Sequence, residues 1–151
     1  MESTTLNEEE LLSDQFEKAV DEYGETFGSE EKREALLNFL QNNDCREMIS
    51  KCVDGDYISN AFVATGFCNH PDLLQTFLDH GVNVDIKNNL GWTALMYASM
   101  NDNKEIVQLL LDHNVDTDLK DKYGRTALEL AKTQEIKEML QNHVNTSYVL
   151  K

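Results

Sequence analysis

Three cysteines and one histidine are the side chains whose types could form a site for a soft metal ion. Cys45, Cys52, Cys68 and His70 are separated by six, fifteen and one intervening residues. Zinc sites instead use ligand pairs two to about four residues apart. Cys52 falls on the apolar face of a predicted helix, where cysteine behaves as a small core residue. We therefore expect neither a metal nor another cofactor, and the odd number of cysteines fits a reducing compartment better than a disulfide scaffold.

A second group of polar residues superficially matches a calcium loop. Its alternating oxygen-bearing side chains are Asp112, Asn114, Asp116 and Asp118. A calcium loop also needs a central glycine and a closing glutamate, but Thr117 and Tyr123 occupy those positions. The sequence also lacks a phosphate-binding glycine loop and a Ser–His–Asp or Cys–His nucleophile pattern. We therefore expect a protein without enzymatic activity.

The charge of the chain restricts its partners. It has 13 Lys and Arg against 28 Asp and Glu, a formal net charge of −15. Nucleic acids and anionic membranes are bound through clustered basic residues, so we expect neither as a direct partner. No apolar run approaches the ~20 residues of a membrane helix, and the first residues do not resemble a signal peptide. The expected location is the cytoplasm or nucleus, and the expected state is a monomer.

The acidic residues are concentrated near the N-terminus, since residues 1–50 contain 14 acids and 4 bases. This segment is either a solvated tail or a binding arm for a basic partner. Apolar residues spaced four, three and four apart predict an amphipathic helix over about residues 8–23: Leu12, Phe16, Ala19 and Tyr23. The helix either docks on the rest of the protein or is left for a partner, and Gly24 to Ser29 is expected to break it.

The chain also contains an internal repeat. The segment 88–95 recurs at 121–128, an offset of 121 − 88 = 33, and an earlier copy begins near Gly55. Within the copy at 88, Gly91 suits a turn, Thr93 is placed to cap a short helix and Asn114 to end a second one. The second helix has an apolar stripe formed by Ile106, Val107, Leu110 and Leu111. One such unit cannot cover its own apolar face, so the copies must stack.

These motifs resemble the ankyrin repeat family. The matching pieces are the Gly-x-Thr-Ala-Leu segments 91–95 and 124–128, the segment 105–111, and the segment 81–85. The resemblance implies an all-α fold, an ankyrin-repeat solenoid of helix-turn-helix units with hairpin-like loops, preceded by the acidic helix. Ile58 and Asn60 replace the usual Gly and Thr of the first copy, so its turn is expected to be irregular.

The predicted organisation divides the chain into six segments. They are an acidic segment 1–34, a degenerate N-capping helix pair 35–54, ankyrin repeats 55–87 and 88–120, a C-capping repeat 121–143 and a tail 144–151.

The family resemblance also implies where a partner would bind, because contacts in this family usually come from the turn tips and first helices. The corresponding residues are Asp56, Tyr57, Ser59, Phe67, Asn89, Leu90, Trp92, Met100, Asn101, Lys122, Tyr123 and Arg125. Aromatic residues and arginine are frequent in binding hot spots. Trp92 could alternatively pack on its own hairpin.

Two functions agree with these features. The first is a non-enzymatic protein–protein interaction module, an adaptor, scaffold or regulatory subunit. The second is an acidic chaperone or inhibitor that shields a basic client, such as a ribosomal or nucleic-acid-binding protein. Salt separates them, because electrostatic binding weakens at high ionic strength and an aromatic anchor does not.

Overall fold

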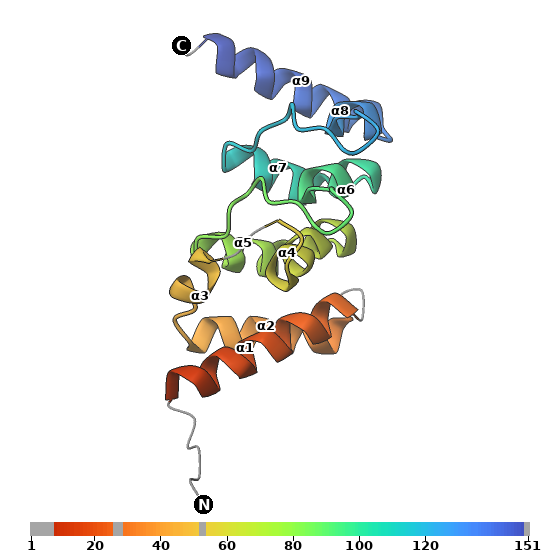
Figure 1. The fold of residues 1–151 in the computed structure, drawn as a ribbon. Helices are drawn as coiled ribbons and strands as arrows, with labels where there is room; N and C mark the ends of the chain where they lie inside the picture. Colours follow the sequence, from red (N-terminus) through yellow and green to blue (C-terminus); the bar gives the residue numbers. More distant parts are fainter. Residues whose placement is uncertain (1–7, 26–28, 52–53, 150–151) are drawn as a thin grey trace, which may run out of the picture.

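The computed structural model describes residues 8–25, 29–51 and 54–149, which form helices joined by loops, without a strand in these ranges. The helices stack along one axis from the N-terminal to the C-terminal end (Figure 1). Their bounds are α1 Glu8–Glu25, α2 Glu30–Asn42, α3 Arg46–Ser50, α4 Tyr57–Cys68, α5 Pro71–Asp79, α6 Ala94–Met100, α7 Lys104–Asp112, α8 Ala127–Leu130 and α9 Gln134–Val149. This confirms the predicted all-α stack. No helix in the described part is long and apolar enough to cross a bilayer.

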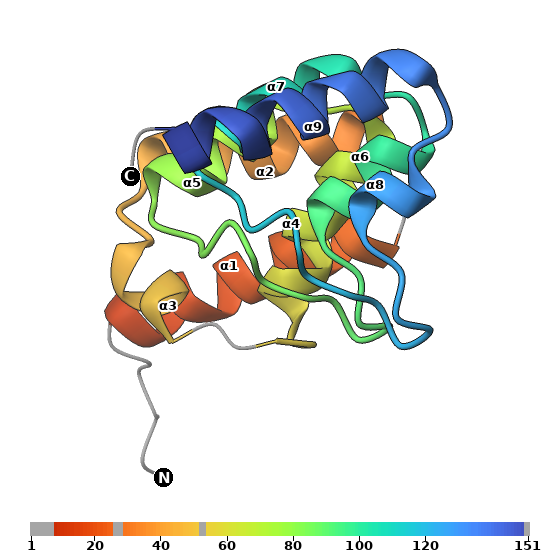
Figure 2. The same cartoon turned by 90° about the horizontal axis from the view of Figure 1, so that it is seen from above.

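The helices form two layers, as the view along the stack shows (Figure 2). Helices α1, α4, α6 and α8 contact one another in sequence along one layer, and α2, α5, α7 and α9 do so along the other. The loops before α6 and α8 project beyond the α4–α6–α8 layer (Figure 2). We call the helices of this layer the inner helices and those of the other layer the outer helices.

The repeated loops have the same local structure. Asn88 Oδ1 accepts hydrogen bonds from the backbone N–H groups of Leu90 and Trp92, both at 3.0 Å. Its counterpart 33 residues later, Asp121, accepts from the same relative positions. Gly91, at the tip, has a φ of +79°, which favours glycine over a residue with a Cβ. The turn chemistry predicted from the repeat is therefore confirmed.

The helix boundaries also follow the repeat. Thr93 caps α6 by accepting from the N–H of Met96 at 3.3 Å. Thr126 caps α8 in a reciprocal box with Glu129. Asn114 ends α7 with a φ of +56°, as Gly81 does in the preceding copy. The predicted stripe of α7 is buried as a whole: Ile106, Val107, Leu110 and Leu111.

The N-terminal capping pair differs from the prediction. The pair is α1 with α2, rather than two helices within 35–54, and the predicted boundary at 34/35 falls inside α2. Helix α1 packs against both α2 and α4, and its Phe16, Val20 and Tyr23 are fully buried. The acidic helix therefore docks on the repeats. Sequence periodicity could not reveal this pairing because α1 has no second copy in the chain.

Polar side chains join the capping pair to α5. Tyr23 Oη on α1 lies 3.0 Å from Nδ1 of His70, the residue that caps α5. Arg33 on α2 pairs with Glu30 in its own helix and with Asp72 on α5. Burial lowers the pKa of His70, and the nearby positive charge of Arg33 acts in the same direction. The neutral imidazole is therefore favoured at this junction.

The first full repeat begins without the predicted turn tip. Helix α4 starts at Tyr57, although the corresponding residues of the next repeat lie in its loop. Ile58 stands where Gly91 and Gly124 turn the chain, and a β-branched residue disfavours positive φ. Asp56 caps the early helix by accepting from the N–H of Ser59 at 2.8 Å. Asp56, Tyr57 and Ser59 therefore belong to a helix start.

Two further boundaries need correction. The segment 144–151, predicted as a tail, continues α9 as far as Val149. This stretch contains no glycine or proline that would end the helix. The break expected from Gly24 to Ser29 starts later than predicted, since α1 continues to Glu25 and α2 begins at Glu30. Cys52, one of the candidate metal ligands, lies outside the described residues.

Candidate protein-binding surface

Aromatic side chains from three successive repeats form a connected row. The rings of Phe67 on α4 and Tyr97 on α6 meet edge to face, with centroids 5.7 Å apart. Tyr97 also packs against Trp92, at 4.6 Å. The Arg125 guanidinium lies 5.8 Å from the Trp92 ring centroid and 5.0 Å from that of Tyr123. We call Phe67, Leu90, Trp92, Tyr97, Tyr123 and Arg125 the aromatic strip.

Arg125 is held in place by the turn that precedes it. Its Nε donates to Asp121 Oδ2 at 2.9 Å, and its Nη2 lies 2.7 Å from the same oxygen. Burial opposes ionisation of Asp121, but hydrogen bonds from Arg125 and from backbone N–H groups outweigh it and lower the pKa of Asp121. The carboxylate therefore fixes the guanidinium between two aromatic rings, where cation–π attraction adds to the ion pair.

The strip leaves substantial apolar surface accessible. The exposed fractions are 69% for Tyr123, 56% for Leu90 and 44% for Phe67. Trp92 is half-buried and packed against the core. The structure therefore agrees with both interpretations of Trp92. Its contact with Tyr97 fits local packing, and its partial exposure fits contact with a partner.

The remaining predicted contact residues differ in accessibility. Asn89, Lys122 and Arg125 are exposed, whereas Met100 and Asn101 are half-buried on α6 and the residue after it. Ser59 is fully buried, and its hydroxyl donates to the Asp56 carbonyl at 2.8 Å. It is therefore not available to a partner. For the remaining predicted contact residues, binding to a partner stays a prediction.

Sequence reasoning missed Tyr97, which joins Phe67 to Trp92. A signal for it was present: Tyr97 lies three and four residues before Met100 and Asn101, so it shares their helical face. The twelve predicted contact residues include none from α1, although the sequence left the N-terminal segment open as a binding arm for a basic partner.

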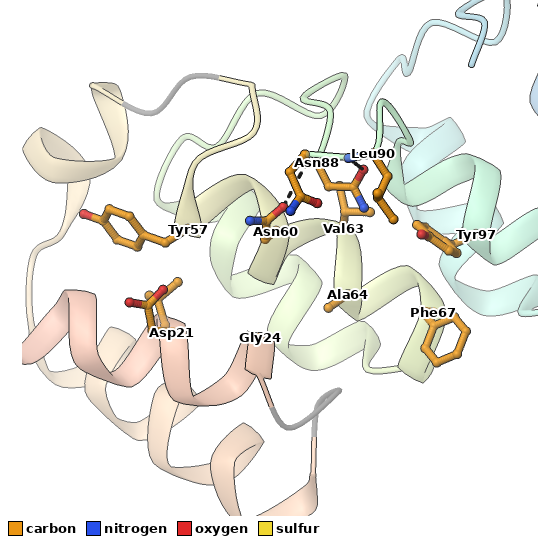
Figure 3. Close-up of a pocket in the computed structure, with 12 residues that line it drawn as sticks. Asp21, Gly24, Tyr57, Asn60, Val63, Ala64, Phe67, Asn88, Leu90 and Tyr97 are labelled. Atoms are coloured by element: carbon orange, nitrogen blue, oxygen red, sulfur yellow. Dashed lines mark hydrogen bonds between the residues drawn. The ribbon is translucent and has the colours of Figure 1, made fainter. Parts of the chain in front are cut away.

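A groove that shares Phe67, Leu90 and Tyr97 with the aromatic strip lies between α1 and α4. It has a volume of ≈ 400 Å³. Figure 3 shows Asp21 and Gly24 on one wall and Asn60, Asn88 and Leu90 on the opposite one. The rings of Phe67 and Tyr97 lie at one end (Figure 3). The complete lining is Val20, Asp21, Gly24, Tyr57, Asn60, Val63, Ala64, Phe67, Asn88, Asn89, Leu90 and Tyr97.

Hydrogen bonds between neighbouring loops fix the hairpin over this groove. The Gly55 N–H donates to the Lys87 carbonyl at 2.8 Å. Lys87 N–H in turn donates to Asp54 Oδ1 at 2.8 Å, and Asn89 N–H donates to Asn60 Oδ1 at 3.0 Å. The groove wall is thus tied to the start of α4.

The histidines at the repeat offset have a structural role. His80 and His113 each donate from Nδ1 to the carbonyl four residues earlier, at 2.9 Å in both cases. Within the described residues, no three His, Cys, Asp or Glu side chains gather in a way that could hold a metal ion.

Comparisons with known proteins agree with this architecture. A family model described as ankyrin repeats (3 copies) matches residues 61–147. No curated protein matches the chain significantly. A solved structure similar in fold is the ankyrin repeat domain of Bcl-3, described as a unique member of the IkappaB protein family, with a TM-score of 0.60 and 22% sequence identity. The similarity covers 73% of this chain and 50% of the Bcl-3 chain, so this chain spans half the length of the Bcl-3 chain. The family model spans more than half of the sequence, and the chain therefore belongs to the ankyrin repeat family.

Proposed function

We propose that this chain is a non-enzymatic protein–protein interaction module, an adaptor, scaffold or regulatory subunit, that binds a protein through the aromatic strip. The observation that supports this proposal most directly is the continuity of the strip across three repeats. Tyr123 and Leu90 are more than half exposed, and contiguous exposed apolar surface is characteristic of interaction sites. The fixed Arg125 guanidinium adds a polar anchor of a kind enriched in hot spots.

Affinity capture tests the proposal. The full chain is the bait in a cell extract, washes at low and high salt run in parallel, and mass spectrometry identifies the bound proteins. We expect a partner that survives both washes and is reduced at least about tenfold by the double variant Leu90→Ala/Tyr123→Ala, equivalent to about 1.4 kcal/mol. Gln108→Ala, at an exposed position on outer helix α7, is the control. Equal capture by the double variant would contradict a role for the strip.

The acidic chaperone is the second candidate, and one observation favours it. Helix α1 carries four exposed carboxylates at a spacing of four, three and four residues: Glu10, Asp14, Glu17 and Asp21. This spacing places them on one helical face, where they can attract a basic client. A partner released by high salt and indifferent to the Leu90→Ala/Tyr123→Ala variant would favour this function over the adaptor.

A further inference from the structure

We infer that the groove between α1 and α4 binds a partner segment in which a bulky apolar side chain lies next to lysine or arginine. The inference rests on the proposed function, because it specifies the chemistry of a protein partner at one part of the surface. It concerns a wall that the ankyrin repeats themselves do not supply, since α1 belongs to the N-terminal capping pair.

The floor of the groove is apolar. Val20 comes from α1, Val63 and Ala64 come from α4, and the Phe67 and Tyr97 rings close one end. A volume of ≈ 400 Å³ lies within the range of ligand pockets, which begins at about 300 Å³. Transfer of an apolar side chain from water into this space is favourable by roughly 25 cal/mol for each Å² that is buried.

The α1 wall of the groove is negatively charged. Asp21 lines it directly, and Glu17 and Asp14 precede it on the same exposed helical face. None of these three forms an ion pair with a described residue. The neighbouring bases have other partners: Lys18 on α1 and Lys32 on α2 pair with Glu22, at 4.0 Å and 2.7 Å. Arg33 pairs with Glu30 and Asp72. The wall therefore has negative charge that a basic segment of a partner can neutralise.

The opposite wall does not repel a cation. It consists of the amides of Asn60, Asn88 and Asn89 together with Leu90, and the lining contains no lysine or arginine. A second copy of this chain is a poor occupant, because a net charge of −15 on each copy opposes their association. Charge complementarity thus selects a basic segment, and the floor selects its apolar residue.

Gly24 provides a way to block the groove without disturbing the fold. It lies in α1 and lines the groove, and a Cβ added there meets no heavy atom within 4 Å. Leucine at this position therefore enters open space, and it also favours the helix more than glycine does. Asp21→Lys reverses the charge of the wall. Glu34→Lys is its matched control, because Glu34 is an exposed acid on the outer helix of the same capping pair.

The probes are three pools of fluorescein-labelled 12-residue peptides. Each peptide has one central Leu, Phe, Trp or Met, and its flanking residues are serine with lysine, serine with glutamate, or serine alone. Binding to the full chain is measured by fluorescence anisotropy. We expect the lysine pool to bind at least tenfold more tightly than the serine pool, and the glutamate pool not to bind. Gly24→Leu should weaken the lysine pool at least tenfold and Asp21→Lys about fivefold, while Glu34→Lys stays within twofold.

Four results would overturn the inference: no binding by any pool, equal binding of the lysine and serine pools, undiminished binding to Gly24→Leu, or equal effects of Asp21→Lys and Glu34→Lys. Amide chemical shifts of the bound chain supply an independent measurement, and shifts centred away from Gly24, Val63 and Ala64 would also overturn it. The proposed function fails separately. A captured partner that depends on Tyr123 but not on Gly24 would refute only the groove. A captured partner that depends on Gly24 but not on Tyr123 would refute only the strip outside the groove, since Leu90 belongs to both surfaces.

Discussion

The capping pair α1–α2 and the C-terminal repeats occupy equivalent places in the two layers but use different means to pack. The inner helix α6 is seven residues long, buries small side chains such as Ala94 and Ala98, and follows a hairpin. The inner helix α1 is 18 residues long and buries Phe16, Val20 and Tyr23. Hydrogen bonds donated by backbone N–H groups of the loops tie neighbouring repeats together. Side chains tie the capping pair to α5 instead: Tyr23 with His70, and Arg33 with Asp72.

This difference accounts for the position of the groove. Between α4 and α6, the Cβ that Gly66 lacks would lie 2.5 Å from the Ala94 carbonyl oxygen, so the two helices are in direct backbone contact. Between α1 and α4, Gly24 faces open space. Close-packed repeats make a continuous wall, and the transition from a repeat to a non-repeated cap leaves a concave surface.

The largest effect is expected from Phe16→Ala, which tests whether the cap and the repeats form one cooperative unit. Phe16 is fully buried and stacks on Phe39 at 5.9 Å. We expect a loss of about 3–5 kcal/mol in the free energy of unfolding, measured by urea denaturation followed by circular dichroism. Phe77→Ala in α5 is the matched substitution in the repeats. A biphasic curve for Phe16→Ala alone would show that the cap unfolds independently.

The two helical glycines test the difference in packing directly. Gly66→Ala should lower the free energy of unfolding by about 1–3 kcal/mol, because the added methyl group overlaps backbone atoms that cannot move aside easily. Gly24→Ala should raise it by about 0.4–1 kcal/mol, because alanine restricts the unfolded chain without creating a clash. Urea denaturation measures the unfolding free energy of both variants. If both substitutions stabilise the protein, or both destabilise it, the two junctions do not differ in packing as described.

The junction at His70 is expected to make stability depend on pH. Burial lowers the pKa of this imidazole in the folded state, so the unfolded chain binds the proton more tightly. The stabilising contribution is complete above the ordinary histidine pKa of about 6.5 and falls as the pH drops toward the folded pKa. Tyr23, Glu30, Arg33 and Asp72 face this ring or its partners.

Urea denaturation at several values from pH 5.5 to 7.5 measures this effect. We expect the unfolding free energy to rise with pH more steeply in the unmodified chain than in His70→Gln. If the unfolding free energy depends on pH equally in both proteins, His70 is not the cause of the pH dependence.

The smallest effect is expected from Tyr123→Ala. Tyr123 is 69% exposed, so removal of its ring should change the unfolding free energy by no more than about 0.5 kcal/mol. Thermal and urea denaturation measure this directly. A loss above about 2 kcal/mol would mean that Tyr123 supports the hairpin and is not primarily a contact for a partner.

Much of the repeat region was predictable because its determinants are local and occur twice. Gly91 with Gly124 and Thr93 with Thr126 mark turns and helix starts at the same offset. The buried stripe of α7 followed from its helical spacing. The aromatic strip was partly predictable, since Trp92, Tyr123 and Arg125 lie on recognisable tips, but the missed Tyr97 joins it together.

Residue types and their spacing along the chain suffice to predict the repeat, its turns and caps, its apolar stripes and the acidic character of the N-terminal segment. The turns, caps and stripes depend on backbone geometry and side-chain spacing within single helices and loops. The repeat follows from comparing such segments 33 residues apart, and the acidic character from composition alone. Three features emerge only from the folded arrangement: α1 pairs with α2 and docks on α4, Ser59 is buried, and Asp21 lies across a groove from Asn88. These outcomes depend on which apolar faces cover one another across long stretches of chain, and the non-repeated α1 provides no second copy from which that choice could be read.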